Sequence, residues 1–257
     1  MHSFQIENLI MTLIVNLSTT HDYSIKEIIA AFAQICKEYS RGCFECIPGL
    51  FHLTNYGWVT LKYQINYKSL IEPYRLGKIS TEEFLDNLTE ILYFLCDMDK
   101  EERNSILAEA WNASIKLSEK TQDRLSLLVE EAKTQPVYLI SNTNELNVNA
   151  ILDLFKQNNP DLKFKEVDTS IKDSKEPIEI LPNIYLCLSY RYGAFKEETV
   201  TTMSLLEHLS TQCSKPITLV SQFPGDRKKG EQLGLEVWDA EEFYNSLTPN
   251  LEMKKAQ

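Results

Sequence analysis

Short runs of apolar residues, each followed by small polar residues, recur along the chain and predict the strands of a buried sheet. These runs cover residues 9–15, 137–140, 184–187 and 217–220. A continuous apolar run of about four to eight residues is typical of a strand that is buried on both faces. Helical patterns separate the runs, and strands that alternate with helices favour a parallel sheet covered by helices. The ligand crevice of such a sheet lies at the carboxyl ends of its strands, where the polar residues gather.

The interval between the first and second predicted strands contains several amphipathic helix patterns. Helices are predicted over residues 25–38, 100–110 and 122–133, and another begins after Ser80. Ser80 and Glu83 form a capping-box pattern, in which the serine side chain caps the helix and the glutamate returns the hydrogen bond. Residues 40–74 mix glycine, proline and aromatic residues without a clear period, so we expect loop and short helix there.

Two later segments have weaker patterns. Residues 156–182 are charged and poor in apolar faces, which predicts an irregular surface segment with one short strand over residues 164–167. Beyond residue 248 we expect a flexible tail, because chain ends are poorly ordered unless other elements hold them.

The charge balance excludes some classes of partner. The 257-residue chain has 37 acidic and 26 basic side chains and a net charge of −11. Such a charge repels nucleic acid and anionic membrane surfaces at long range, so no nucleic-acid partner is expected. The basic run Arg227-Lys228-Lys229 is more simply a solvated helix face. Every apolar run is shorter than the roughly 20 residues that cross a bilayer, so membrane insertion is not expected either.

The cysteines bear on the compartment and on metal binding. Six cysteines are scattered through the chain, a pattern that favours a reducing compartment over a disulfide framework. The first apolar run has no basic flank and is a poor signal peptide, so we expect a cytoplasmic protein. Cys36, Cys43, Cys46 and His52 have part of the spacing of a zinc site. The alternative is that the cysteines are small core residues. Both hypotheses stay open, but without a second Cys-x-x-Cys pair the expectation is no metal.

Segments that follow the predicted strands carry the strongest functional signal. Residues 139–144 (LISNTN) end the second strand, and Ser189, Gly193 and Lys196 follow the third. In their order along the chain these segments resemble the motifs of the haloacid dehalogenase-like (HAD) hydrolase superfamily, most closely its phosphatases related to the N-terminal domain of epoxide hydrolases. In active members of that family, the serine and amide groups of the second motif and the lysine of the third hold the phosphoryl group.

The same family has a helical cap between its first and second motifs. Residues 75–84 (RLGKISTEEF) resemble its cap signature, and Trp111 resembles the tryptophan that follows. The resemblance implies an α/β fold, namely a HAD-like Rossmannoid three-layer sandwich with a parallel sheet and a helical cap domain inserted after the first strand. The expected boundaries are residues 1–22 plus 132–247 for the core domain, 23–131 for the cap domain and 248–257 for the flexible tail.

The first and fourth motifs depart from the family pattern. Asn16 occupies the place of the family's aspartate nucleophile, and Ser18 occupies that of its second aspartate. Ser221 and Gln222 replace the two acids that hold magnesium in the family. Asp226, a little further along, is a weak candidate for a rescuing acid.

These departures predict a pseudoenzyme. A carboxamide is a poor nucleophile and cannot form an acyl-phosphate, and magnesium needs anionic oxygen ligands. We therefore expect no catalytic residue, no cofactor and no magnesium at this site. A fold that is retained without its catalytic acids indicates that the protein works through a binding surface. The leading hypothesis is a protein-binding or scaffold subunit of a larger assembly, such as a bacterial secretion or regulatory complex, so protein partners are expected.

The alternative hypothesis keeps a role for the pocket, as a phosphate-ligand sensor or as a HAD-type phosphatase with a rebuilt active site. Its candidate anion-binding residues are Ser141, Asn142 and Lys196. Lys196 either attracts an anion to the strand ends or pairs with Glu197 or Glu198 and faces solvent, and the sequence leaves both open. His21 is a candidate acid or base in a rebuilt site, and the simpler alternative is an inert histidine.

Overall fold

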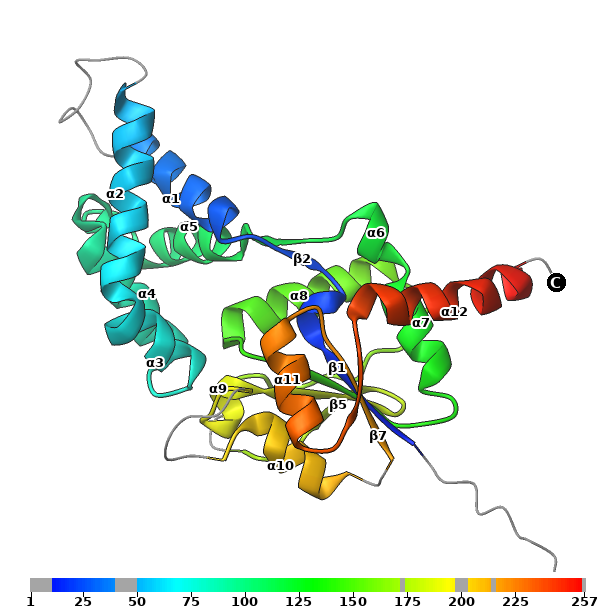
Figure 1. Ribbon diagram of the computed structural model, residues 1–257. Helices are drawn as coiled ribbons and strands as arrows, with labels where there is room; N and C mark the ends of the chain where they lie inside the picture. The colour runs from blue at the N-terminus through cyan, green and yellow to red at the C-terminus, as the bar shows by residue number, and fades with distance from the viewer. Residues whose placement is uncertain (1–10, 40–49, 172–173, 197–202, 214–215, 256–257) are drawn as a thin grey trace, which may run out of the picture.

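The sheet at the centre of the molecule has six strands in the order β5-β6-β4-β1-β7-β8. The computed structural model describes residues 11–39, 50–171, 174–196, 203–213 and 216–255 (Figure 1). The strands are β1 (Thr12–Asn16), β4 (Val137–Ser141), β5 (Ile178–Leu181), β6 (Ile184–Leu188), β7 (Ile217–Val220) and β8 (Glu236–Trp238). All of these are parallel to their neighbours except β5, which runs antiparallel to β6 at one edge. The predicted α/β class with a mainly parallel sheet is confirmed.

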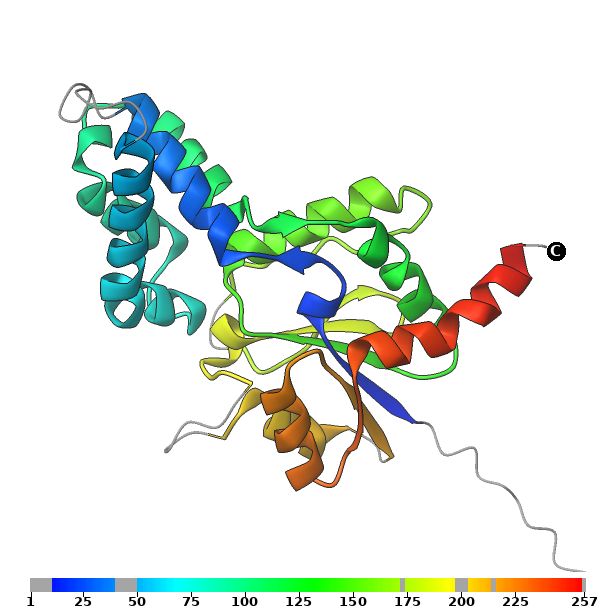
Figure 2. The ribbon, with the colours of Figure 1, turned by 45° about the horizontal axis from the view of Figure 1, so that its top comes forward.

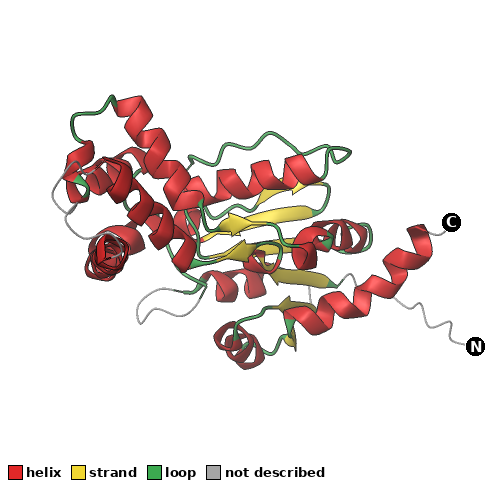
Figure 3. Ribbon diagram, turned by 90° about the horizontal axis from the view of Figure 1, so that it is seen from above, coloured by secondary structure: helices red, strands yellow, loops and turns green. Residues whose placement is uncertain are grey.

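Helices cover both faces of this sheet, as Figure 3 shows. One face packs against α7 (Arg124–Glu131), α8 (Glu145–Asn158) and α12 (Ala240–Lys255). The other packs against α9 (Ser189–Tyr192), α10 (Leu205–Gln212) and α11 (Pro224–Gln232). Within β1, Leu13 belongs to the first cluster of buried side chains and Ile14 to the second, because successive side chains of a strand point to opposite faces. The result is a three-layer arrangement.

A separate hydrophobic cluster lies among the helices that join β1 to β4, which we call the cap helices. They are α1 (Ile25–Tyr39), α2 (Leu50–Asn66), η2 (Tyr67–Ile71), α3 (Glu72–Arg75), α4 (Thr81–Ile91), η3 (Tyr93–Leu95) and α5 (Lys100–Asn112). Phe84 is fully buried at the cluster's centre, with ring centroids 4.1 Å from Tyr74 and 4.8 Å from Trp111. Figure 2 shows the cap helices beside the sheet, reached through the antiparallel pair β2 (Asp22–Tyr23) and β3 (Ile115–Lys116).

The expectation of loop and short helix over residues 40–74 is wrong for most of its length. Residues 40–49 lie outside the described part of the chain, but α2, η2 and α3 make residues 50–75 helical. The reason is packing, because Val59, Leu70 and Tyr74 are buried in the cap cluster and tertiary contacts stabilise helices that lack a strong one-sided pattern. Neither α2 nor any other described helix has the length and apolarity needed to span a membrane.

Three other expectations need correction. The cap domain ends earlier than the expected residue 131. After β3 come α6 (Glu119–Gln122) and α7, and α7 packs on the sheet through Leu125 and Leu128. Residues 164–167 form no strand. Instead β5 occupies the sheet edge, because its Ile180 and Leu181 bury fully there, and Lys165 donates one backbone bond to Ile180. The expected flexible tail is helical as far as residue 255, since α12 continues through it.

Candidate functional site

The carboxyl ends of the parallel strands bring together residues from distant parts of the sequence. Since β1 lies between β4 and β7, Asn16 at its end lies between Ser141 and Ser221. A cavity of about 220 Å³ lies at this edge of the sheet, and Asn16, Ser141, Asn142 and Lys196 line it. The structure thus brings the residues matched to three motifs to one place, with Ser221 fully buried next to Asn16.

Asp226, in the first turn of α11, is the centre of a buried polar cluster at the strand ends. Its Oδ2 atom accepts hydrogen bonds from Asn16 Nδ2 at 2.8 Å, Ser221 Oγ at 2.8 Å and Lys196 Nζ at 2.9 Å. The side chains of Lys196 and Asp226 are only 7% and 6% exposed. Of the two alternatives left open for Lys196, the solvent-facing one is wrong, because the side chain is buried and a buried charge needs a carboxylate partner. Glu197 and Glu198 lie outside the described residues. The Lys196 ammonium is already neutralised by its ion pair with Asp226.

The other end of the Asn16 side chain is held as well. Its Oδ1 atom accepts bonds from the backbone N–H of Ser18 at 3.2 Å and from Ser18 Oγ at 2.8 Å. Asn16 is thereby the cap of the short turn η1 (Leu17–Thr19) that leaves β1. Gln222 is exposed and donates to Ser18 Oγ at 3.3 Å. Both the nitrogen and the oxygen of the Asn16 carboxamide therefore form hydrogen bonds within the protein.

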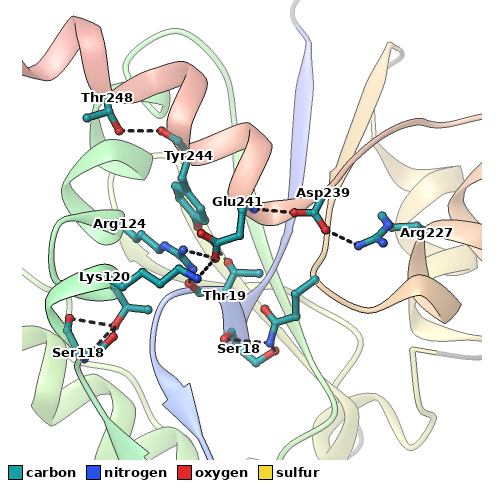
Figure 4. Close-up of polar contacts among 12 residues, drawn as sticks. Ser18, Thr19, Ser118, Lys120, Arg124, Arg227, Asp239, Glu241, Tyr244 and Thr248 are labelled. Atoms are coloured by element: carbon teal, nitrogen blue, oxygen red, sulfur yellow. Dashed lines mark hydrogen bonds and ion pairs between the residues drawn. The ribbon is translucent and has the colours of Figure 1, made fainter.

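Side chains from α7 and α12 fix the turn that follows Asn16 (Figure 4). Arg124 donates to the carbonyl oxygen of Thr19 at 2.6 Å and to Glu241 Oε1 at 2.5 Å. Its guanidinium lies 4.6 Å from the centroid of the Tyr244 ring, whose hydroxyl is 3.0 Å from Thr19 Oγ1. Burial raises the pKa of Tyr244 to about 12, so this hydroxyl stays protonated. The C-terminal helix thus holds the position of the candidate site.

The loop after α3 joins the cap helices to the strand ends. Arg75 donates to the carbonyl oxygen of Asn142 at 2.6 Å, and the carbonyl oxygen of Arg75 accepts from Ser189 Oγ at 2.7 Å. Thr81 at the start of α4 donates to Glu145 at the start of α8, at 2.5 Å. These bonds connect the cap signature to the second and third motifs, and Arg75 also lines the cavity.

Trp111 adds a contact from the far end of the cap helices. Its indole N–H donates to Asn147 Oδ1, in the first turn of α8, at 2.8 Å. Asn144, the N-cap of α8, accepts from the backbone N–H of Asn147. Trp111 and Asn144 of the matched motifs are therefore joined through Asn147 in one hydrogen-bonded unit between α5 and α8.

His21 lines the cavity and is buried. Burial lowers its pKa to about 4, with Asp22 and the Leu17 carbonyl opposing that change. The imidazole is neutral near pH 7, and its Nδ1 lies 3.4 Å from Thr20 Oγ1. A neutral histidine tied to its neighbour fits the inert alternative better than the acid–base one.

The zinc hypothesis is only partly within the described structure. Cys36 is buried in α1, and burial raises the pKa of its thiol to about 11, so the thiol is not a ready metal ligand. The side chains of Cys43, Cys46 and His52 lie outside the described part of the chain. Across the described residues there is no group of three or more His, Cys, Asp or Glu side chains arranged for a metal.

Sequence reasoning underrated Asp226 and missed Arg124. The available signal for Asp226 was an acid in the first turn of a helix that follows a matched strand end. Arg124 gave no local signal, because its role depends on Thr19 and Glu241, which are distant in sequence.

Comparison with known proteins identifies the fold. No protein-family model matches the sequence, and no curated protein matches it either. Among solved structures, a HAD-family enzyme from Bacteroides thetaiotaomicron superposes with a TM-score of 0.60 at 16% identity, covering 90% of this chain and 93% of that one. Its wild-type complex with magnesium and inorganic phosphate gives 0.57 at 14% identity over the same shares. The chain therefore has the fold of HAD-family hydrolases, as the motifs predicted.

Proposed function

We propose that this chain, whose fold is that of HAD-family hydrolases, does not hydrolyse phosphate esters at the strand ends and acts by binding. The observation that carries the proposal is the state of Asn16. Its carboxamide stands where the fold's nucleophile is expected, and it donates to Asp226 and accepts from Ser18. An amide held at both ends cannot attack phosphorus to form the covalent intermediate that such hydrolases use.

The residues at the strand ends do not fit a magnesium ion as they stand. Asp226 supplies a carboxylate, but its Oδ2 atom already accepts from Lys196, Asn16 and Ser221. The Lys196 ammonium lies 2.9 Å from that same oxygen, so a divalent cation bound there would be repelled by the nearby positive charge. Magnesium also prefers one or two free carboxylates together with water. We therefore assign no metal-dependent step to this site.

The cavity favours a small ligand over a purely structural role. Its volume of about 220 Å³ exceeds the roughly 150 Å³ of an engineered cavity that binds benzene. Its walls combine amide and hydroxyl groups with aromatic rings, which is the usual composition of a ligand pocket. A binding protein that has kept this pocket accounts for both the retained fold and the altered motifs.

Two other functions remain as proposals. A protein-binding or scaffold role is favoured by Leu61 and Ile65, which are 53% and 62% exposed and lie one turn apart on α2. A phosphatase with a rebuilt site is favoured by the Bacteroides enzyme, whose structure holds magnesium and inorganic phosphate.

A phosphatase assay separates the two binding roles from a phosphatase with a rebuilt site. The full chain should show no hydrolysis of p-nitrophenyl phosphate above background, with or without magnesium. The Asn16→Asp variant should be measured beside the wild type. Asn16 Nδ2 lies 2.8 Å from Asp226 Oδ2, so the variant places a second carboxylate next to that of Asp226. Its melting temperature should rise with added magnesium, by mass action on the folded state, whereas that of the wild type should not. Wild-type turnover that increases with magnesium and is lost in Asn16→Ala would refute the proposal.

A further inference from the structure

The cavity between the strand ends and the cap helices has two chemically different sides. Its polar side comes from the strand ends and α8, with Asn16, Ser141 and Asn142 among its residues. Its opposite side comes from the cap helices and the segments that lead to them, and includes Arg75, Tyr63, Ile71, Trp111 and Ile115. A smaller apolar cavity of about 50 Å³ shares Tyr63, Ile71 and Trp111 as lining residues. A ligand here meets hydrogen-bonding groups on one side and flat apolar surfaces on the other.

The charges along this wall leave one cation without an ionic partner. Lys196 is paired with Asp226 at 2.9 Å, and His21 is neutral because burial lowers its pKa to about 4. Among the described residues that line the cavity there is no aspartate or glutamate. Arg75 also lines it, and no carboxylate of the described chain forms an ion pair with Arg75. The described lining residues therefore carry a net charge of one positive unit, located on the cap side of the cavity.

Arg75 is held in place by neutral groups. One terminal nitrogen donates to the Asn142 carbonyl oxygen at 2.6 Å and the other to the Tyr67 hydroxyl at 3.3 Å, and the guanidinium lies 5.6 Å from the Phe195 ring centroid. A guanidinium has five N–H donors, so these two bonds do not use all of them. Burial raises the pKa of Tyr63 to about 12, and the nearby charge of Arg75 opposes that rise. The Tyr63 phenol therefore stays protonated near pH 7.

We infer that the cavity binds a small organic monoanion of the carboxylate class, with its charged end at Arg75 and its body against Tyr63, Ile71 and Trp111. This inference rests on the proposed binding function and names its ligand. A guanidinium is the protein group best suited to a carboxylate, because its planar fork of N–H groups can donate two parallel hydrogen bonds.

The charge count favours a carboxylate over a phosphate ester. A phosphate monoester carries close to two negative charges near pH 7, and one arginine leaves the second charge uncompensated. In an active phosphatase of this fold the strand-end lysine would help, but here Lys196 is committed to Asp226. The net charge of −11 on the whole chain does not exclude an anionic ligand, because charges beyond about 8 Å are screened at physiological salt.

Calorimetric titration of the full chain with paired acids and amides tests the inference. The probes are benzoate with benzamide and indole-3-acetate with indole-3-acetamide, together with phenyl phosphate and inorganic phosphate. At least one acid should bind about tenfold or more tightly than its own amide, since a charge-assisted hydrogen bond is stronger than a neutral one. Phenyl phosphate should bind more weakly than that acid, and inorganic phosphate more weakly still. If no acid binds, if acid and amide bind equally, or if the phosphates bind best, the inference is overturned.

Two variants locate the charged end. Arg75→Gln should weaken binding of the acid about tenfold to a hundredfold while leaving that of the amide nearly unchanged. The control is Arg103→Gln, which removes an arginine from the cap helices where it pairs with Asp86 and does not line the cavity. Unchanged acid binding in a folded Arg75→Gln variant contradicts the inference. If that variant does not fold, Arg75→Lys keeps the charge and should retain part of the preference, and the wild-type comparison of acid with amide decides by itself.

The proposed function, the lack of phosphate-ester hydrolysis, is tested by a separate measurement. Release of phenol from phenyl phosphate in the same titration mixtures, dependent on magnesium, would remove the proposed function without altering an acid-over-amide preference. A silent assay combined with no preference would remove the ligand assignment alone.

Discussion

Asp226 decides what the residues at the strand ends can do. A lysine and a carboxylate that bury together stay charged only if each neutralises the other and hydrogen bonds satisfy the remaining oxygens. Asn16 and Ser221 provide those bonds, so the cluster is complete without an external ligand. On the proposed binding function, the same side chain accounts for both the pairing of Lys196 and the proposed lack of a magnesium site.

The first prediction concerns this ion pair. Asp226→Asn should lower the free energy of unfolding by about 3 kcal/mol, because it leaves the ammonium of Lys196 buried without a counter-charge. Urea denaturation measures the loss. The matched control is Asp86→Asn, whose carboxylate is 46% exposed and pairs with exposed Lys100 and with mostly buried Arg103, so the change should be within about 1 kcal/mol. Equal losses in the two variants would mean that the buried pair contributes no more than a surface pair.

The second prediction concerns His21 and pH. Its pKa is lowered from 6.5 to about 4 by burial, so the unfolded chain binds a proton more readily than the folded chain between these values. Stability due to this residue is complete above pH 6.5 and falls as the pH drops, by about 3 kcal/mol at pH 4. Unfolding measured at several pH values should show a steeper loss in the wild type than in His21→Gln. Identical pH profiles would show that His21 is accessible to protons in the folded state.

At the scale of elements, a single loop sets how the cap helices meet the sheet. Gly77, two residues past the end of α3, has a φ angle of +70°, and a Cβ atom there would lie 2.0 Å from the carbonyl oxygen of Tyr190 in α9. Only glycine allows the two backbones to approach so closely. The neighbouring bonds of Arg75 to Asn142 and of Ser189 to Arg75 depend on that approach.

The third prediction tests this contact. Gly193→Ala is the control, because Gly193 has a φ angle of +77° but open space around its Cβ position, so it should cost only the roughly 1–2 kcal/mol of a left-handed residue. Gly77→Ala should cost clearly more, since the cap loop must also move away from Tyr190. Urea denaturation of both variants gives the comparison. If the two losses are equal, the close approach at Gly77 contributes nothing beyond backbone strain.

At the scale of the whole molecule, hydrophobic burial and net charge have opposite effects on the stability of the folded state. The buried clusters of the sheet and of the cap helices stabilise the compact state, while a net charge of −11 repels itself within it. Surface ion pairs such as Lys100 with Glu82 offset only a little of this repulsion, because exposed pairs contribute about 0–1 kcal/mol each.

The fourth prediction follows from that balance. Raising the salt concentration from about 0.01 M to about 0.15 M shortens the screening length from about 30 Å to about 8 Å, which weakens the long-range repulsion more than the short ion pairs. The melting temperature should therefore rise, by roughly 2–4 °C if screening contributes about 1 kcal/mol. Potassium chloride at equal ionic strength should give the same shift as sodium chloride. A melting temperature that falls with salt would show that ion pairs outweigh net repulsion.

The sequence by itself determined the four central strands β6, β4, β1 and β7, the cap helices α1, α4 and α5, and the absence of acids from the matched motif positions. Strands such as β4 and β7 are readable locally because each buries an unbroken apolar run. The identity of Asn16 and of Ser221 needs no structure at all. The helical character of residues 50–75 and the edge strand β5 were not readable, because contacts with the rest of the chain stabilise them and local periodicity does not show those contacts.

Only the tertiary structure decided the chemistry of the site. Asn16 and Asp226 are 210 positions apart in the chain, and their 2.8 Å contact exists because α11 begins beside the end of β1. The pairing of Lys196 with Asp226, and the absence of an acidic partner for Arg75 among the described residues, depend in the same way on which loops meet at the sheet edge. Residue types name the groups that can carry charge, but burial and distance decide which charges are cancelled and which remain for a ligand.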